Sequence, residues 1–365
     1  MLEFLTLKPE TFGLDISDLS VKIVQLKKRG QFFELASFGE AVIKPGAIKQ
    51  GEIKNENSLA KIINKSLTEV KGRKIKTKYV IASLPEEKAF LQVIQMPRLS
   101  EEDLKSAVIY EAENYIPLPI EEVYLDYQII SPVYNHLDHF DVLIAALPQK
   151  IVNSYLSCLE KAGLKPLALE IESLSIARAL IKDELAVTPV LLVDFGATRA
   201  SFIIFSGRSL RFTASIPVSS QKFTEAISRA LNIDLVKAEK LKLKYGLETR
   251  ATKEGGEVFD ALIPALTDLI EQIKKHLDFY QTHAGHEHLP PNGKGIGKIL
   301  LCGGGANLKG LTNFLSSELK LPVELGNPWV NVLPDRQKTA PQLSFEKSLS
   351  YTTALGLALR GIKEK

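Results

Sequence analysis

The residues best suited to chemistry lie in two similar segments about half a chain apart. In the first, Asp15 and Ser17 stand between two apolar runs, and in the second Asp194 is followed by Gly196 and Thr198. Each segment predicts a strand, a tight turn and a returning strand. The amides of such a turn point toward an anion, and the Asp can hold a hydrated Mg2+. Two hairpins of this kind predict two related domains that close on one nucleotide.

A glycine-rich turn near the end of the sequence is a third candidate contact. Residues 298–302 form an apolar strand pattern, three glycines follow at 303–305, and a helical pattern covers 308–319. This order brings the backbone close to a ligand, because glycine adds no side chain and a helix N-terminus attracts anions.

The elements that must position these loops are strands and helices in alternation. Apolar runs predict strands at residues 32–36, 79–84, 141–147 and 167–171. Helical spacing predicts helices at residues 59–67, 149–161, 173–185, 222–231, 235–245, 259–282 and 348–363. Pro189 marks the boundary into the second half, and 365 residues are enough for two domains.

Residues 86–139 are interpreted as an insert in the first half. Ser100 and Asp103 form a capping box that opens a helix to about Tyr115, before two prolines end it. Residues 90–95 and 123–130 alternate as strands do. Two interpretations of the tyrosines stay open, the lining of an apolar channel and the insert's own core. These tyrosines are Tyr110, Tyr115, Tyr124 and Tyr127.

Composition excludes several classes of protein. The sequence is 45% apolar and 24% charged, which is typical of a soluble globular protein, and its net charge of +3 is too small to indicate a nucleic-acid partner. Cys158 and Cys302 are expected to be buried thiols, which fits a reducing compartment. Since no run of 18 apolar residues and no signal-peptide pattern occurs, we expect a cytoplasmic location.

Two polar segments have more than one interpretation. The basic run at residues 71–78 predicts a solvated loop, with contact to anionic lipid headgroups as the alternative. Residues 283–293 contain three histidines and predict a mobile polar loop. A metal site is the alternative there, although no Cys or carboxylate cluster supports it.

Together, the two hairpins, the helices after them and the glycine turn resemble the actin, Hsp70 and sugar-kinase superfamily. Within it the sequence most resembles the type IV pilus assembly family PilM, a relative of the cell-division family FtsA. Residues 12–17, 116–117 and 353–359 carry this resemblance. It implies an α/β, actin-like (ribonuclease H-like) two-domain ATPase fold with an FtsA-like insert in the first domain.

The resemblance also implies domain limits. The first domain would cover residues 1–188, with the insert at about 86–139, and the second would cover 189–344. A helical subdomain at about 222–295 would cover the nucleotide, and a C-terminal helix at 345–365 would pack back on the first domain.

The phosphate and metal contacts of the family map onto both hairpins. Asp15 and Asp194 match the residues that bind Mg2+ through water, and Lys22 matches the lysine that reaches the terminal phosphates. Ser17 stands where relatives have glycine, so the backbone there approaches phosphate less freely. The phosphate contacts implied in the second turn are Gly196, Ala197 and Thr198.

The adenosine contacts map onto later residues. The resemblance implies that Gly303, Gly304 and Gly305 form the adenosine turn, and that Asn307 caps the helix that follows. Residues 237–246 resemble a helix of FtsA-like proteins in which Glu239 would reach the ribose and Lys242 the base. Their i, i+3 spacing suits a shared ligand.

Hydrolysis is a separate question, because it needs a residue that orients the attacking water. Glu172 occupies the region where relatives place a Gln or Glu, but the usual proline after it is absent. A helix-capping role for Glu172 or Ser173 is the alternative. We therefore expect ATP and Mg2+ binding with at most slow hydrolysis.

The resemblance implies a cytoplasmic ATP-binding scaffold of the type IV pilus inner-membrane platform, or of a related secretion or competence system. Its partner would be the cytoplasmic N-terminal segment of PilN, together with other platform proteins, in a groove between the first domain and the insert. Self-association stays open, and no nucleic-acid partner is expected. The alternatives are a sugar-kinase-like phosphotransferase and an FtsA-like cell-division filament protein.

Overall fold

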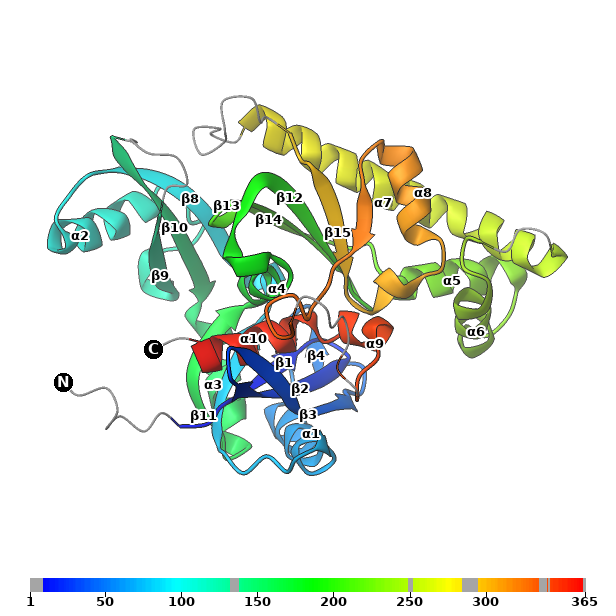
Figure 1. The fold of residues 1–365 in the computed structure, drawn as a ribbon, viewed down its shortest axis with the longest axis horizontal. Helices are drawn as coiled ribbons and strands as arrows, with labels where there is room; N and C mark the ends of the chain where they lie inside the picture. The colour runs from blue at the N-terminus through cyan, green and yellow to red at the C-terminus, as the bar shows by residue number, and fades with distance from the viewer. Residues whose placement is uncertain are drawn as a thin grey trace.

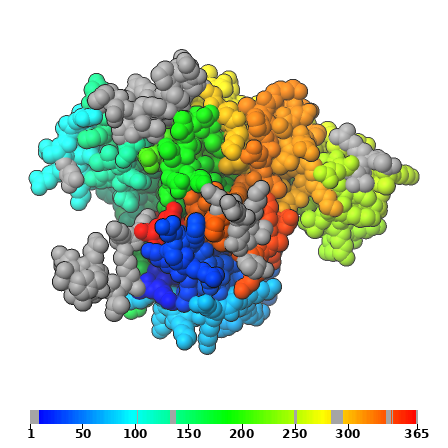
Figure 2. All heavy atoms as spheres, viewed as in Figure 1, coloured from blue at the N-terminus to red at the C-terminus, as the bar shows by residue number. Residues whose placement is uncertain are grey.

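The computed structural model describes residues 9–131, 138–248, 252–283, 295–334, 340 and 342–363. Within them, the chain forms two larger sheets, each flanked by helices, and a smaller insert (Figure 1). The first sheet lies at the bottom of the view, the second above it and the insert at the upper left. Figure 2 shows residues near the C-terminal end, in red, between the part of the chain that contains the first sheet and the part that contains the second sheet.

The first sheet is built around a buried hairpin. Its strands are β1 (Phe12–Ile16), β2 (Ser20–Arg29), β3 (Phe32–Val42), β6 (Lys71–Gly72), β7 (Tyr79–Leu84) and β11 (Lys165–Ile171), in the order β11-β7-β1-β2-β3-β6. β1 pairs antiparallel with β2 and parallel with β7. A two-stranded hairpin of β4 (Ile48–Lys49) and β5 (Glu52–Ile53) lies beside it.

Helices cover both faces of the first sheet because side chains along a strand point alternately to opposite faces. Leu14 and Ile16 pack in one core cluster with residues of α1 (Glu56–Thr68) and α3 (Gln149–Lys161). The opposite face of β1 meets α10 (Thr352–Lys363), which also packs on α4 (Glu172–Leu180).

The close packing of α10 depends on two glycines. A Cβ atom at Gly356 would lie 1.8 Å from the Ser175 carbonyl oxygen, and one at Gly13 would lie 2.4 Å from the Ala354 carbonyl oxygen. Any larger residue at either position would therefore push α10 away from α4 or from β1.

The second sheet repeats the strand order of the first. Its strands are β12 (Ala186–Phe195), β13 (Ala200–Gly207), β14 (Ser209–Ile216), β15 (Lys298–Cys302) and β16 (Val323–Leu325), in the order β14-β13-β12-β15-β16. β12 pairs antiparallel with β13 and parallel with β15, as β1 does with β2 and β7. Its helices are α5 (Ser220–Leu231), α6 (Leu235–Tyr245), α7 (Lys253–His283) and α8 (Leu311–Leu319).

The insert is a three-stranded sheet with one helix. It contains β8 (Phe90–Pro97), α2 (Glu101–Ala112), β9 (Val123–Ile130) and β10 (His139–Pro148), in the strand order β8-β10-β9. β10 is the central strand, so the insert sheet extends to residue 148 and beyond the expected limit at 139. Ser100 caps α2 by accepting from the Asp103 amide, as predicted, but α2 ends three residues before Tyr115.

Several predicted elements match the structure, among them the strand at residues 79–84 and the helices at 149–161 and 235–245. The expected domain limit at Pro189 falls inside β12, which begins at Ala186. The single C-terminal helix is two, because Ser350 and Tyr351 separate α9 (Phe345–Leu349) from α10.

One predicted helix is shorter in the structure, and one predicted polar segment falls mostly outside the described residues. α4 ends at Leu180, before the predicted end at 185, because the chain turns at Asp183, whose φ is 52°. The polar segment predicted at 283–293 lies outside the described residues except for His283, the last residue of α7. Among the described residues, no helix has both the length and the apolar character needed to cross a membrane.

Candidate functional site

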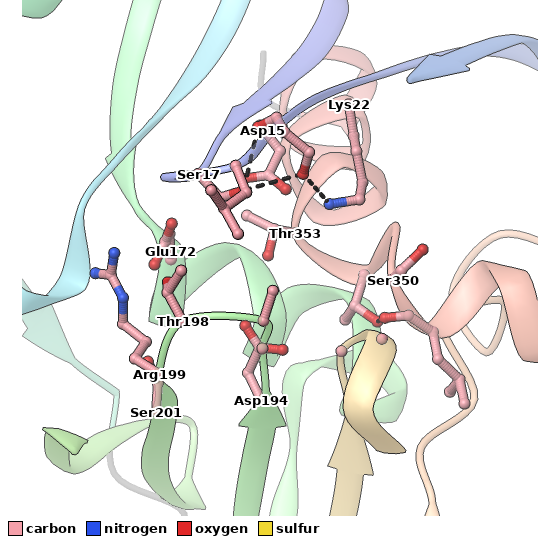
Figure 3. Close-up of a pocket in the computed structure, with 18 of the residues that line it drawn as sticks. Asp15, Ser17, Lys22, Glu172, Asp194, Thr198, Arg199, Ser201, Ser350 and Thr353 are labelled. Atoms are coloured by element: carbon pink, nitrogen blue, oxygen red, sulfur yellow. Dashed lines mark hydrogen bonds between the residues drawn. The ribbon is translucent and has the colours of Figure 1, made fainter. Parts of the chain in front are cut away.

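The two hairpin turns face each other across a cavity of about 290 Å³. Asp15 lies near the end of β1 on one side and Asp194 near the end of β12 on the other, with Glu172 between them at the start of α4 (Figure 3). The cavity collects most of the predicted residues. Those that line it are Asp15, Ser17, Lys22, Glu172, Asp194, Gly196, Ala197, Thr198, Gly303 and Gly304.

The first turn is held by hydrogen bonds from a neighbouring strand. The Ser83 hydroxyl, at the end of β7, accepts from the Ile16 amide at 2.8 Å and donates to Asp15 Oδ1 at 3.3 Å. Asp15 pairs across the hairpin with Lys22, whose ammonium donates to Ser20 Oγ at 2.7 Å. Ser83 therefore fixes the Asp15 carboxylate, and Lys22 brings the positive charge on this side of the cavity.

The second turn closes on itself and is hydrogen-bonded to the start of α5. The Gly196 amide donates to the Arg199 carbonyl oxygen at 2.9 Å, and the Gly196 carbonyl oxygen accepts from the Ser220 amide at 3.0 Å. A side chain at Gly196 would lie 2.9 Å from the Arg199 carbonyl oxygen, so the turn needs glycine there. Ala197 is exposed and Thr198 half-buried, which leaves this edge open to the cavity.

The glycine turn packs against the second turn. Gly303 has a φ of +81°, and a Cβ atom there would lie 2.2 Å from Asp194 Oδ1, so glycine is needed for both reasons. Gly305 is buried against Phe195 and does not line the cavity. Asn307 caps no helix, because α8 starts later, after Gly310. Instead, its amide donates to the Glu346 carbonyl oxygen at 2.9 Å and attaches α9 to the turn.

The predicted pair on α6 also lies outside the cavity lining. Lys242 is 3% exposed, and its ammonium lies 2.8 Å from Glu239 Oε2 and donates to Ser220 Oγ and Thr224 Oγ1, both at 2.8 Å. Because Ser220 also bonds Gly196, Lys242 supports the second turn from behind. Glu239 is 44% exposed at its side chain.

The carboxylates of the cavity carry more negative charge than its surroundings offset. Burial raises the pKa of Asp15, while Lys22 lowers it. Burial, and then repulsion from Asp15, raises the pKa of Asp194 to about 6. Burial also holds the pKa of Glu172 well above its usual range, with Asp15 and Asp194 raising it further. A bound cation would relieve this repulsion.

Sequence reasoning missed several side chains of the cavity. Arg199 lines the cavity and follows Thr198 directly, so its position in the turn could have predicted it as a lining residue. Thr353 lies in a motif already noted, whereas Ser350 lies in none. Glu40 reaches the cavity from β3, which no local pattern indicates.

The arrangement suits a polyanion with a divalent cation. The two turns and Lys22 offer amide, hydroxyl and ammonium donors, and the carboxylates offer hard oxygen ligands. Within the described ranges, no three His, Cys, Asp or Glu side chains converge closely enough to hold a metal ion directly. An ion between the carboxylates would therefore take part of its ligands from water or from a ligand.

Comparisons with known proteins agree with this geometry. The sequence matches the family described as "Type IV pilus assembly protein PilM" over residues 13–362. The solved PilM-PilN type IV pilus biogenesis complex has a TM-score of 0.79 and 28% identity, covering 98% of this chain and 100% of that chain. MreB 5 of Spiroplasma citri bound to AMPPNP is similar in fold, with a TM-score of 0.56, 13% identity, and 97% and 96% coverage.

A curated relative outside that family is the cell division protein FtsA of Pseudomonas aeruginosa. It is 25% identical over 226 residues, which are 57% of this chain and 50% of FtsA. The chain spans about half the length of the curated relatives it matches. The predicted actin-like fold and the resemblance to PilM and FtsA are confirmed.

The raised pKa of Asp194 predicts a pH dependence of stability. A carboxyl group with a pKa of about 6 in the folded chain, against 3.8 as its usual value, stabilises the fold fully below about pH 4. That contribution is lost as the pH rises through about 6. Between pH 4.5 and 7.5, without divalent cations, we expect the free energy of unfolding to fall less in Asp194→Asn than in the parent. The difference between the two falls should be at most about 2–3 kcal/mol.

Urea denaturation of both proteins at the two pH values measures the difference. Asp260→Asn, which changes an exposed carboxyl on α7, is the control and should follow the parent. Equal slopes for the parent and Asp194→Asn would contradict the assignment of this pKa.

Proposed function

This chain belongs to the family of type IV pilus assembly protein PilM, and we propose that it is a Mg2+–ATP-dependent scaffold of a pilus inner-membrane platform. The observation that carries the proposal is the cavity in which Asp15 and Asp194 face each other from equivalent positions of two repeated sheets. We propose that the protein is cytoplasmic and reaches the membrane through protein partners. Membership of this family favours a scaffold over a sugar kinase.

The described residues fit a metal–nucleotide ligand. Asp15 and Asp194 would hold Mg2+ through water, and a cation there would offset the repulsion from Asp15 that contributes to the raised pKa of Asp194. Lys22 and the turn at Gly196 would bind phosphates, because they supply the donors of the cavity. Mg2+ would neutralise charge on the β and γ phosphates.

The base and ribose have a less complete site in this arrangement. Gly303 and Gly304 line the cavity on the side of the glycine turn and would lie against adenosine. Glu239 is half-exposed and could turn toward a ribose, whereas Lys242 is committed to Ser220 and Thr224. We propose that Lys242 acts on the nucleotide indirectly, by holding the second turn.

We propose that the protein hydrolyses ATP slowly at most. Glu172 lies where a water-orienting carboxylate is needed, but burial raises its pKa well above the usual range and so disfavours the charged form that would accept a proton from water. The same shift toward the neutral form reduces repulsion with Asp15 and Asp194, which favours nucleotide binding without turnover.

A second cavity is the proposed partner site. It has a volume of about 250 Å³ and lies between the insert, the helices α4 and α10, and the second sheet. β9 is the edge strand of the insert sheet and contributes Gln128 to the lining. An extended segment could pair with the open edge of β9 and place apolar side chains near Leu143 and Phe205.

We propose that this segment is the cytoplasmic N-terminus of PilN, because the similar solved structure is a PilM-PilN complex. The insert tyrosines do not line this cavity, which leaves both interpretations of them open. Tyr127 packs on the insert core, Tyr124 donates to Asn153 Oδ1 at 3.1 Å, and Tyr110 is 74% exposed. The peptide would therefore meet aliphatic and basic side chains.

Nucleotide binding is tested by removing one metal-side carboxylate. We expect Asp194→Ala to bind Mg2+–ATP at least about tenfold more weakly than the parent, which is about 1.4 kcal/mol. ATP without Mg2+ should bind Asp194→Ala at least as tightly as the parent, because the carboxylate helps only through the ion and otherwise repels the phosphates. Isothermal titration measures both. Asp260→Ala is the control, and an Asp194→Ala protein that binds Mg2+–ATP like the parent would refute the site.

Turnover is tested at Glu172. We expect steady ATP hydrolysis by the parent to stay far below the roughly 1 s⁻¹ at which phosphotransfer enzymes begin to work. Glu172→Gln should change this rate little and keep Mg2+–ATP binding, since burial already disfavours the charged form of the parent side chain. Phosphate release measures the rate. Fast hydrolysis that disappears in Glu172→Gln would make the protein a working ATPase.

The partner site is tested by filling it from the edge strand. Gln128 is exposed on β9, so Gln128→Trp should block the cavity without disturbing a core, and weaken binding of a PilN N-terminal peptide at least about tenfold. Ile129 points to the opposite face of β9, so Ile129→Trp should bind within about twofold of the parent. Fluorescence anisotropy measures both. Undiminished binding by Gln128→Trp would place the peptide elsewhere.

A further inference from the structure

One arginine of the second turn reaches two other parts of the molecule. Arg199 Nη2 lies 3.2 Å from Asp18 Oδ2 in the first turn, and its guanidinium also forms an ion pair with Glu87. Glu87 lies in the 3-10 turn Glu86–Lys88, which leads directly into the insert. The side chains of Arg199, Asp18 and Glu87 are 16%, 11% and 15% exposed. This cluster joins both hairpin turns and the base of the insert.

Arg199 is also part of the turn itself. Its carbonyl oxygen accepts from the Gly196 amide at 2.9 Å, so any movement of this turn moves the guanidinium with it. On the other side, Asp18 Oδ1 accepts from the Gly51 amide at 3.0 Å, which anchors the first turn to its own domain. The ion pair with Asp18 thus spans the cleft between two anchored turns.

The turn at the base of the insert has a second attachment. Glu86 is 4% exposed, and its Oε2 accepts from the Ser173 amide at the start of α4, at 3.1 Å. The turn is therefore held between α4 on one side and Arg199 on the other. Because β8 begins two residues after it, a shift of the turn shifts the insert sheet.

The insert sheet is also attached to the second sheet at another point. Arg211 on β14 donates to Asp141 Oδ2 on β10 at 2.6 Å, and the two side chains are 7% and 10% exposed. The insert belongs to the first half of the chain by connectivity, yet two ion pairs fasten it to the second half. Relative motion of the two halves must therefore act on the insert.

We propose that the Arg199–Glu87 ion pair couples the nucleotide cavity to the position of the insert. When a ligand orders the turn at residues 196–199, Arg199 holds Glu87 and draws the base of the insert toward the second domain. Loss of the ligand loosens the turn and releases the insert. The inference rests on the proposed nucleotide binding and adds the residues that transmit it.

Hydrogen exchange of the full chain, with and without Mg2+–ATP, tests the coupling. In the parent we expect Mg2+–ATP to slow exchange in β8, β9 and β10 by about threefold or more, because the insert becomes fastened. In Glu87→Gln this change in the insert should largely disappear. Mg2+–ATP affinity should stay within about threefold of the parent, because Glu87 does not line the cavity.

Two comparisons separate coupling from general loosening. Glu225→Gln removes a carboxylate that pairs with Arg229 at 3.3 Å on α5, and should keep the full response of the insert. Glu87→Asp keeps the charge and should restore part of the response. In an Arg199→Gln background, Glu87→Gln should have no additional effect, since the partner is already absent.

Each outcome decides the proposal. A full insert response in Glu87→Gln, or no insert response in a parent that binds Mg2+–ATP, would overturn the coupling and leave the nucleotide site standing. A parent that does not bind Mg2+–ATP in titration would overturn the proposed function, and the coupling with it.

Discussion

Repulsion among buried carboxylates is the constraint on which the rest of the structure depends. Asp15, Asp194 and Glu172 share one cavity, and burial raises the pKa of all three. Repulsion from neighbouring carboxylates raises the pKa of Asp194 and Glu172 further, whereas Lys22 lowers that of Asp15. The surrounding fold must hold these groups together against that repulsion. It does so with apolar packing of α10 on the first sheet and of α4 on the second sheet, and with the ion pair between Arg199 and Asp18 across the cleft. Such an arrangement costs stability in the empty protein and favours a cation when one is available.

The duplication of the sheet explains why the carboxylates meet. Each half places its hairpin in the middle of a sheet, with a parallel strand on the other side of the first hairpin strand. The two Asp residues therefore stand at equivalent ends of β1 and β12. Their surroundings differ, since Asp15 pairs across its hairpin with Lys22 while Asp194 pairs with Ser201. Lys22 therefore brings positive charge to the cavity from the first domain, while Arg199 brings it from the turn that precedes Ser201.

Local sequence patterns predicted the elements whose cause is local. The strand at residues 79–84 and the helix at 235–245 have the predicted limits because Pro85 ends the first and Gly246 the second. The hairpin turns and the glycine turn were found for a similar reason, since small residues at a tight turn are visible in the sequence. About half of the residues that line the cavity were therefore predicted from the sequence.

What escaped prediction depends on contacts between distant segments. β10 looks like any buried strand, and only its pairing with β8 and β9 assigns it to the insert. Asn307 looks like a helix cap, but it bonds α9 instead. Lys242 has the spacing of a ligand contact, yet the hydroxyls of Ser220 and Thr224 already occupy its ammonium. The local sequence of the β10 strand, of Asn307 and of Lys242 fits two structural roles in each case. Only the contacts with distant segments decide which role is taken.

The close packing of α10 at Gly13 and Gly356 affects the order in which the two domains can fold during synthesis. β1 leaves the ribosome before α10, which covers one of its faces. The first domain cannot complete its own core until residues 352–363 are available, although its sheet is finished at residue 171. The second domain, whose strands end at residue 325, takes Leu349 of α9 into its core and can therefore be completed only slightly earlier. Nascent chains of this protein therefore pass through a period in which the N-terminal half carries an uncovered apolar face. Such a face promotes aggregation and is a binding surface for chaperones.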